Sequence, residues 1–334
     1  MPKKLKDTEY LFLTAVLRAR EPRMLTREKM ERMLDTAAFD DAAKLLEDSG
    51  FEDMSKMTAR QIEDALGRRR AELFEDLIKL SPEPRVIDIF RLKYDYHNIK
   101  TLIKAEGAGV DGSPLLSDSG RFEPKLLAEA FPEEKYDFLP DCLAEAAREA
   151  KAVLARTGNP QLADFILDRA QYAEMLSLTA EVGSDFLTAY ARISVDSANL
   201  RCVVRAARMK NGAGLLRSAL IPGGNIGLDK LREAHPTEPE GLAAIFATTF
   251  LEYAAEAGAE AASGGSLTKF ELECDNAMNS FLGTAKLVSF GEAPIAAHIA
   301  AQETELMSVR MILTGRLAGV DAGIIRERLR EAYA

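Results

Sequence analysis

The chain has 334 residues, of which 47% are hydrophobic and 29% are charged, and its formal net charge is -10. A chain of this length buries roughly three quarters of its unfolded surface and suggests two or three domains. Because phosphate binding favours a basic surface, the acidic balance argues against a nucleic-acid partner. No signal peptide is evident, and no stretch has the ~20 apolar residues that a membrane-spanning helix needs.

The residues that usually carry redox, metal or phosphate chemistry are not arranged for it. Cys142, Cys202 and Cys274 are far apart and form no C-x-x-C pair, which favours reduced, buried thiols in a cytoplasmic protein. The three histidines are not spaced as metal ligands. No G-x-x-x-x-G-K-[ST] phosphate loop occurs, so we expect no cofactor and no direct nucleotide binding.

The first elements in chain order are helices with clear boundaries. Leucine, alanine, arginine and glutamate dominate, and runs of alternating β-branched residues are almost absent, so we predict an all-α fold. A first helix is expected from Asp7 to Arg20, where the Glu21-Pro22 step ends it. Thr26 and Thr58 are expected to be N-caps of the next helices, and Gln61 completes a capping box with Thr58.

Later elements follow the same plan. After a break at 81–84, a long helix is expected from Arg85 to Gly107 or Gly109. A second set of helices is expected over 142–210, and a third from about Pro294 to the carboxyl end.

The helix that follows Arg85 carries an unusual polar pattern. Asp95 and Asn98 share one helical face with Ile99 and Leu102, at positions i, i+3, i+4 and i+7. This pattern returns twice, at intervals of about 100 residues, which indicates repeated domains and not a solenoid. The polar residues of the later copies are Asp196 and Asn199 in the second, and Gln302 and Glu305, followed by Arg310, in the third.

A similar closing motif follows each copy. It reads L-x-E-A-F at 127–131, L-x-E-A-H at 231–235 and L-x-E-A-Y at 329–333. Before the first two closing motifs, Gly120 and Gly224 are each followed two residues later by an apolar residue. Internal triplication is the simplest explanation of the two series. We expect three similar helical domains, with the boundaries 1–135, 136–237 and 238–334.

The segments KYDYHNIKTLIKA (93–105) and VDSANLRCVVRA (195–206), with the closing motifs, resemble the C subunit of V-type (A/V-type) ATP synthases. That family includes the d subunit of the vacuolar ATPases. The resemblance covers almost the full length, including YLFLTAVLRAR (10–20) and ETELMSVRMILTGRLAG (303–319). It implies three similar helical domains arranged as a pseudo-threefold funnel.

The resemblance also implies a function. Members of this family are non-catalytic central-stalk subunits, and they form a socket that couples the central shaft to the membrane rotor ring. The implied role is in proton or sodium transport by a rotary ATPase. The implied partners are the shaft subunits and the rotor ring, and the implied location is cytoplasmic and peripheral to the membrane, with no direct insertion.

Other functions remain open for the repeated polar residues. Burying a carboxylate is costly unless partners satisfy it, so we expect Asp95, Asp196 and Glu305 to belong to structural networks at helix contacts. Acid-base catalysis by an uncharacterised enzyme is the alternative, and it requires Asp95 and Asn98 to lie in an open cleft. A generic helical adaptor is a further alternative, which would not copurify with rotary ATPase subunits.

Overall fold

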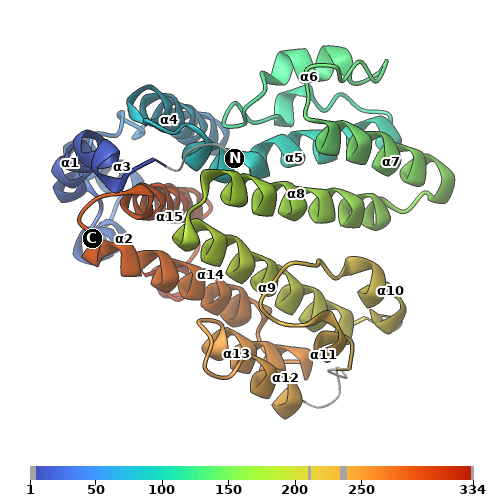
Figure 1. Cartoon of the computed structure of the whole chain (residues 1–334). Coiled ribbons are helices and arrows are strands. Elements are labelled where there is room, and N and C mark those ends of the chain that lie inside the picture. The colour runs from blue at the N-terminus through green and yellow to red at the C-terminus, as the bar shows by residue number, and fades with distance from the viewer. Residues whose placement is uncertain (1–4, 210–211, 234–238, 332–334) are drawn as a thin grey trace. The chain divides into compact units, whose positions relative to one another are not determined.

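A computed structural model describes residues 5–209, 212–233 and 239–331 of the chain (Figure 1). The chain divides into two compact units, which we describe separately. Unit 1 contains Arg85–Gly265, and unit 2 contains Leu5–Pro84 together with Ser266–Ala334. All regular elements within the described ranges are helices, which confirms the all-α prediction. No helix in these ranges is both long and apolar enough to cross a bilayer.

Unit 1 is built on long helices that pack side by side. Helix α8 lies against α5, α7 and α9, and α9 also contacts α10 and α13 (Figure 1). The bounds of these elements are α5 (Arg85–Ala108), η4 (Ser113–Leu115), α6 (Pro124–Ala130), α7 (Asp141–Thr157), α8 (Pro160–Val182), α9 (Asp185–Ala207), α10 (Gly212–Ala219), α11 (Leu228–Glu233), α12 (Pro239–Phe246) and α13 (Glu252–Ala262).

The core of the first half of unit 1 lies between α5, α6, α7 and α8. Its largest members are Tyr96 on α5 and Tyr136 in the loop after α6, and both are almost completely buried. Alanines on α7, such as Ala147 and Ala150, allow α8 to approach closely. Leu127 of α6 enters the same core and so attaches this short helix to the long ones.

Unit 2 is organised around α15, which contacts α1, α2, α3, α4, α14 and α16. Its core is formed by α15 residues such as Leu306 and Val309, together with Met30 of α2 and Ile62 of α4. The bounds are η1 (Asp7–Tyr10), α1 (Leu11–Arg20), η2 (Glu21–Arg23), α2 (Arg27–Asp35), α3 (Phe39–Lys44), η3 (Glu47–Ser49), α4 (Ala59–Leu80), α14 (Leu267–Gly283), η5 (Thr284–Leu287), α15 (Glu292–Leu317) and α16 (Ala322–Arg326).

Several predicted helix boundaries are confirmed. Thr26 accepts a hydrogen bond from the Lys29 amide, and Thr58 and Gln61 form the predicted capping box at the start of α4. Helix α5 ends at Ala108, and Gly109 follows it in the left-handed conformation, with φ 68°. A residue with a side chain is strained at such an angle, so glycine is the suitable stop.

Two expectations, one on the last closing motif and one on the cysteines, need correction. The closing motif expected at 329–333 forms no helix over its described part, because α15 ends at Leu317 and the short helix α16 follows it instead. Residues 332–333 and 234–235, which complete the last two closing motifs, lie outside the described residues. Cys142 is exposed at the start of α7 and Cys202 is only partly buried, whereas Cys274 is buried as expected.

The capping box of α4 predicts a measurable loss of stability on mutation. Thr58→Ala removes the side chain that accepts from the Gln61 amide, and we expect it to lower the free energy of unfolding by about 1 kcal/mol. The measurement is urea denaturation followed by circular dichroism. Arg60→Ala, at an exposed position in the same turn, is the control. An equal effect of both variants would contradict the importance of the cap.

Candidate functional site

The buried asparagines of α5 and α9 each bind one residue of a following loop through both of its backbone groups. Asn98 donates from Nδ2 to the Ser117 carbonyl at 2.9 Å and accepts from the Ser117 amide at 2.8 Å. Asn199 makes the same two bonds with Ile221, both at 2.8 Å. Neither asparagine is exposed to solvent. Each side-chain amide therefore provides hydrogen-bond partners for both the N–H and the C=O of one loop residue, as a neighbouring peptide group would.

The buried aspartates bind the next part of the same loops. In the first loop, Asp95 accepts from the amide of Arg121 at 2.7 Å and from the amide of Phe122 at 3.4 Å. The Arg121 guanidinium also donates from Nε to Asp95 Oδ2 at 2.6 Å. The carboxylate thus holds two consecutive backbone amides and one side chain.

Asp196 repeats this arrangement in the second loop. It accepts from both the backbone amide and the side chain of Asn225 at 2.9 Å, and from the Ile226 amide at 3.1 Å. Asn225 stands where the first loop has an arginine, and it makes the same kind of contact. The two loops differ in charge, but in each the aspartate accepts from two consecutive backbone amides.

Gly120 and Gly224 are needed because the aspartates approach the backbone closely. A Cβ atom added at Gly120 would lie 2.4 Å from Asp95 Oδ1, and one added at Gly224 would lie 2.1 Å from Asp196 Oδ1. Both distances are far below van der Waals contact. These are the glycines that precede the first two closing motifs in the sequence.

The third copy of the pattern binds a segment from the other end of unit 2. Glu305 on α15 accepts from the Leu25 amide at 2.7 Å. Leu25 lies two residues before the start of α2, as Phe122 does before α6 and Ile226 before α11. A carboxylate on each long helix therefore holds the amide that is two residues before a short helix.

The remaining residues of the predicted set have different roles. Gln302 is partly buried one turn before Glu305 and lines a cavity in unit 2. Arg310 is exposed and pairs with Glu63 of α4, outside this cluster. The long helices of unit 1 therefore bring together Asp95 with Asn98 and Asp196 with Asn199, whereas Arg310 is a surface residue.

Sequence reasoning missed an ionic network around Asp95. Arg121 links Asp95 to Glu174 of α8, with 2.8 Å between Arg121 Nη1 and Glu174 Oε1. The Tyr96 hydroxyl donates to the other Glu174 oxygen at 2.9 Å. No short-range pattern marks this network, because Tyr96 and Glu174 are 78 positions apart in the chain.

Burial dominates the electrostatics of the carboxylates. It raises the pKa of Asp95 above its ordinary value, against the opposing effect of Arg121 and the loop amides. Burial also raises the pKa of Asp196, against the effect of the Ile226 and Asn225 amides. Since burying a charge costs free energy that its partners only partly offset, these groups add less net stability than the number of their hydrogen bonds would indicate.

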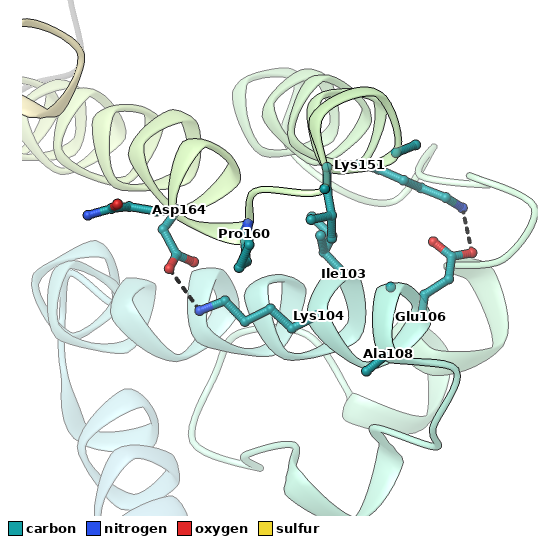
Figure 2. Close-up of a pocket in the computed structure, with 12 residues that line it drawn as sticks. Ile103, Lys104, Glu106, Ala108, Lys151, Pro160 and Asp164 are labelled. Atoms are coloured by element: carbon teal, nitrogen blue, oxygen red, sulfur yellow. Dashed lines mark hydrogen bonds and ion pairs between the residues drawn. The ribbon is translucent and has the colours of Figure 1, made fainter. Parts of the chain in front are cut away.

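A large groove in unit 1 lies elsewhere. It has a volume of about 1010 Å³ between the end of α5, the end of α7 and the start of α8 (Figure 2). Figure 2 shows Ile103 and Pro160 between two ion pairs, Lys104 with Asp164 at 2.8 Å and Lys151 with Glu106 at 3.1 Å. Both carboxylates in the groove are thus paired with lysines. No metal-binding group of three or more His, Cys, Asp or Glu side chains is found in the described ranges.

The close approach at the second loop predicts an effect specific to Gly224. Gly224→Ala should displace Asp196 from the loop amides and lower the free energy of unfolding by about 2–4 kcal/mol. Gly227→Ala is the matched control, because a Cβ there meets nothing within 4 Å. It should cost less than about 1 kcal/mol. Chemical denaturation measures both, and similar losses would refute the predicted contact.

Asn199 gives an independent prediction for the same loop. Asn199→Ala leaves the buried amide and carbonyl of Ile221 without their partner, so we expect a loss of about 2–4 kcal/mol in the free energy of unfolding. Arg192→Ala, at an exposed position on the same helix, should change it by less than about 0.5 kcal/mol. Wild-type stability of Asn199→Ala would mean that the loop does not depend on this side chain.

Comparison with known proteins identifies the family. The family model described as "ATP synthase (C/AC39) subunit" matches residues 13–328. The chain is 25% identical over 327 residues to the C subunit of the V-type sodium ATPase of Enterococcus hirae, covering 97% of this chain and 99% of that protein. It is 25% identical over 341 residues to the C subunit of the A-type ATP synthase of Haloquadratum walsbyi, covering 95% and 96% of the two chains.

A third relative matches over a shorter stretch. The C subunit of the A-type ATP synthase of Thermococcus onnurineus is 27% identical over 238 residues, covering 68% of this chain and 64% of that protein. These matches confirm the resemblance that the repeated motifs indicated. Because the family model covers nearly the whole chain, the protein belongs to the ATP synthase (C/AC39) subunit family.

Proposed function

We propose that this protein is a non-catalytic central-stalk subunit of a V/A-type rotary ATPase, a socket that couples the shaft to the membrane rotor ring. Membership in the family over residues 13–328 is the observation that carries the proposal. ATP hydrolysis and the transport of protons or sodium ions then belong to other subunits. The protein would act in the cytoplasm, at the membrane surface, through these partners.

The hydrogen bonds to the amides just before the short helices α6, α11 and α2 support an internal repeat in the chain. Each of α5, α9 and α15 uses a buried carboxylate to hold the amide two residues before a short helix. We propose that these long helices are the centres of three related domains, with boundaries near 135 and 237. The long helix of the third domain holds the segment 24–35, which comes from the N-terminal part of the chain, in the way that α5 holds 121–131. A pseudo-threefold funnel is the arrangement that the family resemblance implies.

Loops held in this way suit a part that transmits torque. A loop held only by solvent would yield under load, whereas loops bound through two or three buried hydrogen bonds move with their long helix. The enzyme alternative is weaker, because Asp95 and Asn98 are fully buried and do not lie in an open cleft. The generic adaptor alternative is distinguished by the partners that the protein binds.

The first test identifies those partners. Tagged protein is purified from mildly solubilised native membranes, and the proteins recovered with it are identified by mass spectrometry. We expect the shaft, the rotor ring and the nucleotide-binding subunits in regular proportion. Their absence, with the ATPase intact in the same extract, would contradict the proposal and favour a generic adaptor.

A second test concerns coupling. In membranes that carry Gly224→Ala as the sole copy, we expect ATP-driven ion transport to fall more than ATP hydrolysis does, because the loosened loop transmits less torque. Gly227→Ala should leave the ratio of the two activities unchanged. An unchanged ratio in both variants, with the protein present in the complex, would argue against a role of this loop in coupling.

A further inference from the structure

A polar cavity in unit 2 is lined by residues with buried polar atoms that have no hydrogen-bond partner among the described residues. It has a volume of about 290 Å³ and is lined by residues of α15 and α4 and of the segments around Met24 and Gly50. Its lining includes three arginines and three carboxylates. A space of this size has room for several water molecules or for a small polyatomic ion.

His298 is the most unusual residue of this cavity. Its side chain is completely buried, and neither ring nitrogen has a hydrogen-bond partner among the described residues. Burial lowers the pKa of His298 to about 4, with a further contribution from the positive charges of Arg20 and Arg18. The ring is therefore neutral at pH 7 and offers one N–H donor and one acceptor nitrogen.

Two further groups are left open in the same cavity. Glu305 uses Oε1 to bind the Leu25 amide, whereas its buried Oε2 has no partner in the described parts of the chain. Arg69 uses its terminal nitrogens to bind the carbonyls of Gly50 and Ser49, and its buried Nε is left without a partner there. A buried polar atom without a partner costs about 1–3 kcal/mol, so a filled cavity is strongly favoured.

The open groups define the chemistry of the ligand. Arg69 Nε and one nitrogen of His298 can only donate, so the ligand needs acceptor oxygens. The other nitrogen of His298 can only accept, so the ligand also needs a hydroxyl group. A tetrahedral oxyanion that carries a proton, such as hydrogen phosphate, has both kinds of group.

The charged side chains that line the cavity suit an anion when Glu305 is protonated. Arg20, Arg23 and Arg69 are opposed by Glu72, Asp76 and Glu305, and Arg20 lies 3.7 Å from Asp76. Burial raises the pKa of Glu305, against the effects of the Leu25 amide, Arg69 and Gln302. Burial thus favours proton uptake by Glu305 when an anion binds. With Glu305 protonated, the lining has a net positive charge and Oε2 carries a proton that it can donate, and the arginine guanidinium is suited to binding tetrahedral oxyanions.

We propose that this cavity is a binding site for a hydroxylated oxyanion, with hydrogen phosphate as its simplest form, held by His298, Arg69, Glu305 and Arg23. The bound ion would reinforce the contact between Glu305 and Leu25, and so the attachment of α2 to α15. The proposal concerns a single unit of the chain and does not depend on the proposed role in the central stalk.

The test uses the full chain and the few histidines it contains. Labelling of the histidine ring at Cε1 alone gives one signal for each histidine, and His298→Gln assigns that of His298. The signal is followed during titration with inorganic phosphate, sulfate or glycerol phosphate at constant ionic strength. We expect saturable binding of phosphate with a Kd of about 1 mM or below. Sulfate, which has no hydroxyl group at pH 7, should bind about tenfold more weakly.

Matched variants make the test specific. Arg23→Gln, at an exposed position that lines the cavity, should weaken phosphate binding about fivefold or more, and Arg60→Gln, with the same charge change elsewhere, should not. Glycerol phosphate separates a site for the free ion from one for a phosphate ester, according to which of the two binds more tightly. Absence of saturation up to about 20 mM, equal shifts with phosphate and sulfate, or equal effects of both variants would overturn the proposal.

Discussion

The structure depends on buried side-chain oxygens that bind backbone amides just before short helices. Loop amides at the start of a helix have no intrahelical partner, so they need one from elsewhere when they are buried. Asp95, Asp196 and Glu305 supply that partner from the long helices. Once the amide is held, the short helix begins at a defined place. Leu127, Leu231 and Met30 are then fixed in the cores of their units.

The three segments before α6, α11 and α2 are held by different side chains. The first loop uses a charged network in which Arg121 joins Asp95 to Glu174, and the second uses the neutral side chain of Asn225. The third uses the longer carboxylate Glu305, and it binds a segment 280 positions away in the chain. The hydrogen bond from the backbone amide is retained while the charge of the surrounding groups varies, which is expected if the purpose of these contacts is the position of the loop.

The sequence predicted the helices well, because caps and breakers act over a few residues. Thr26 and Thr58 begin their helices where they were expected, and Gly109 is one of the two glycines that were expected to end α5. The repeated pairs were also visible, because polar residues on an apolar helical face are rare. Spacing alone could show that Asp95 and Asn98 share a face, but not which loop they bind.

The contacts that could not be predicted are those between distant segments. Leu25 and Glu305 carry no pattern that connects them, and the third closing motif at 329–333 suggested a helix that its described residues do not form. His298 and Arg69 became candidates only when the cavity brought them together. Tertiary packing decides such pairs, and a single sequence holds no record of it.

Hydrogen exchange at the three held amides is the measurement that tests this account most directly. We predict that the amides of Phe122, Ile226 and Leu25 exchange as slowly as those inside the long helices, because opening them requires breaking a buried bond to a carboxylate. Exchange at the rate of exposed loop amides would contradict the account, since the loops would then be held by something other than these side chains.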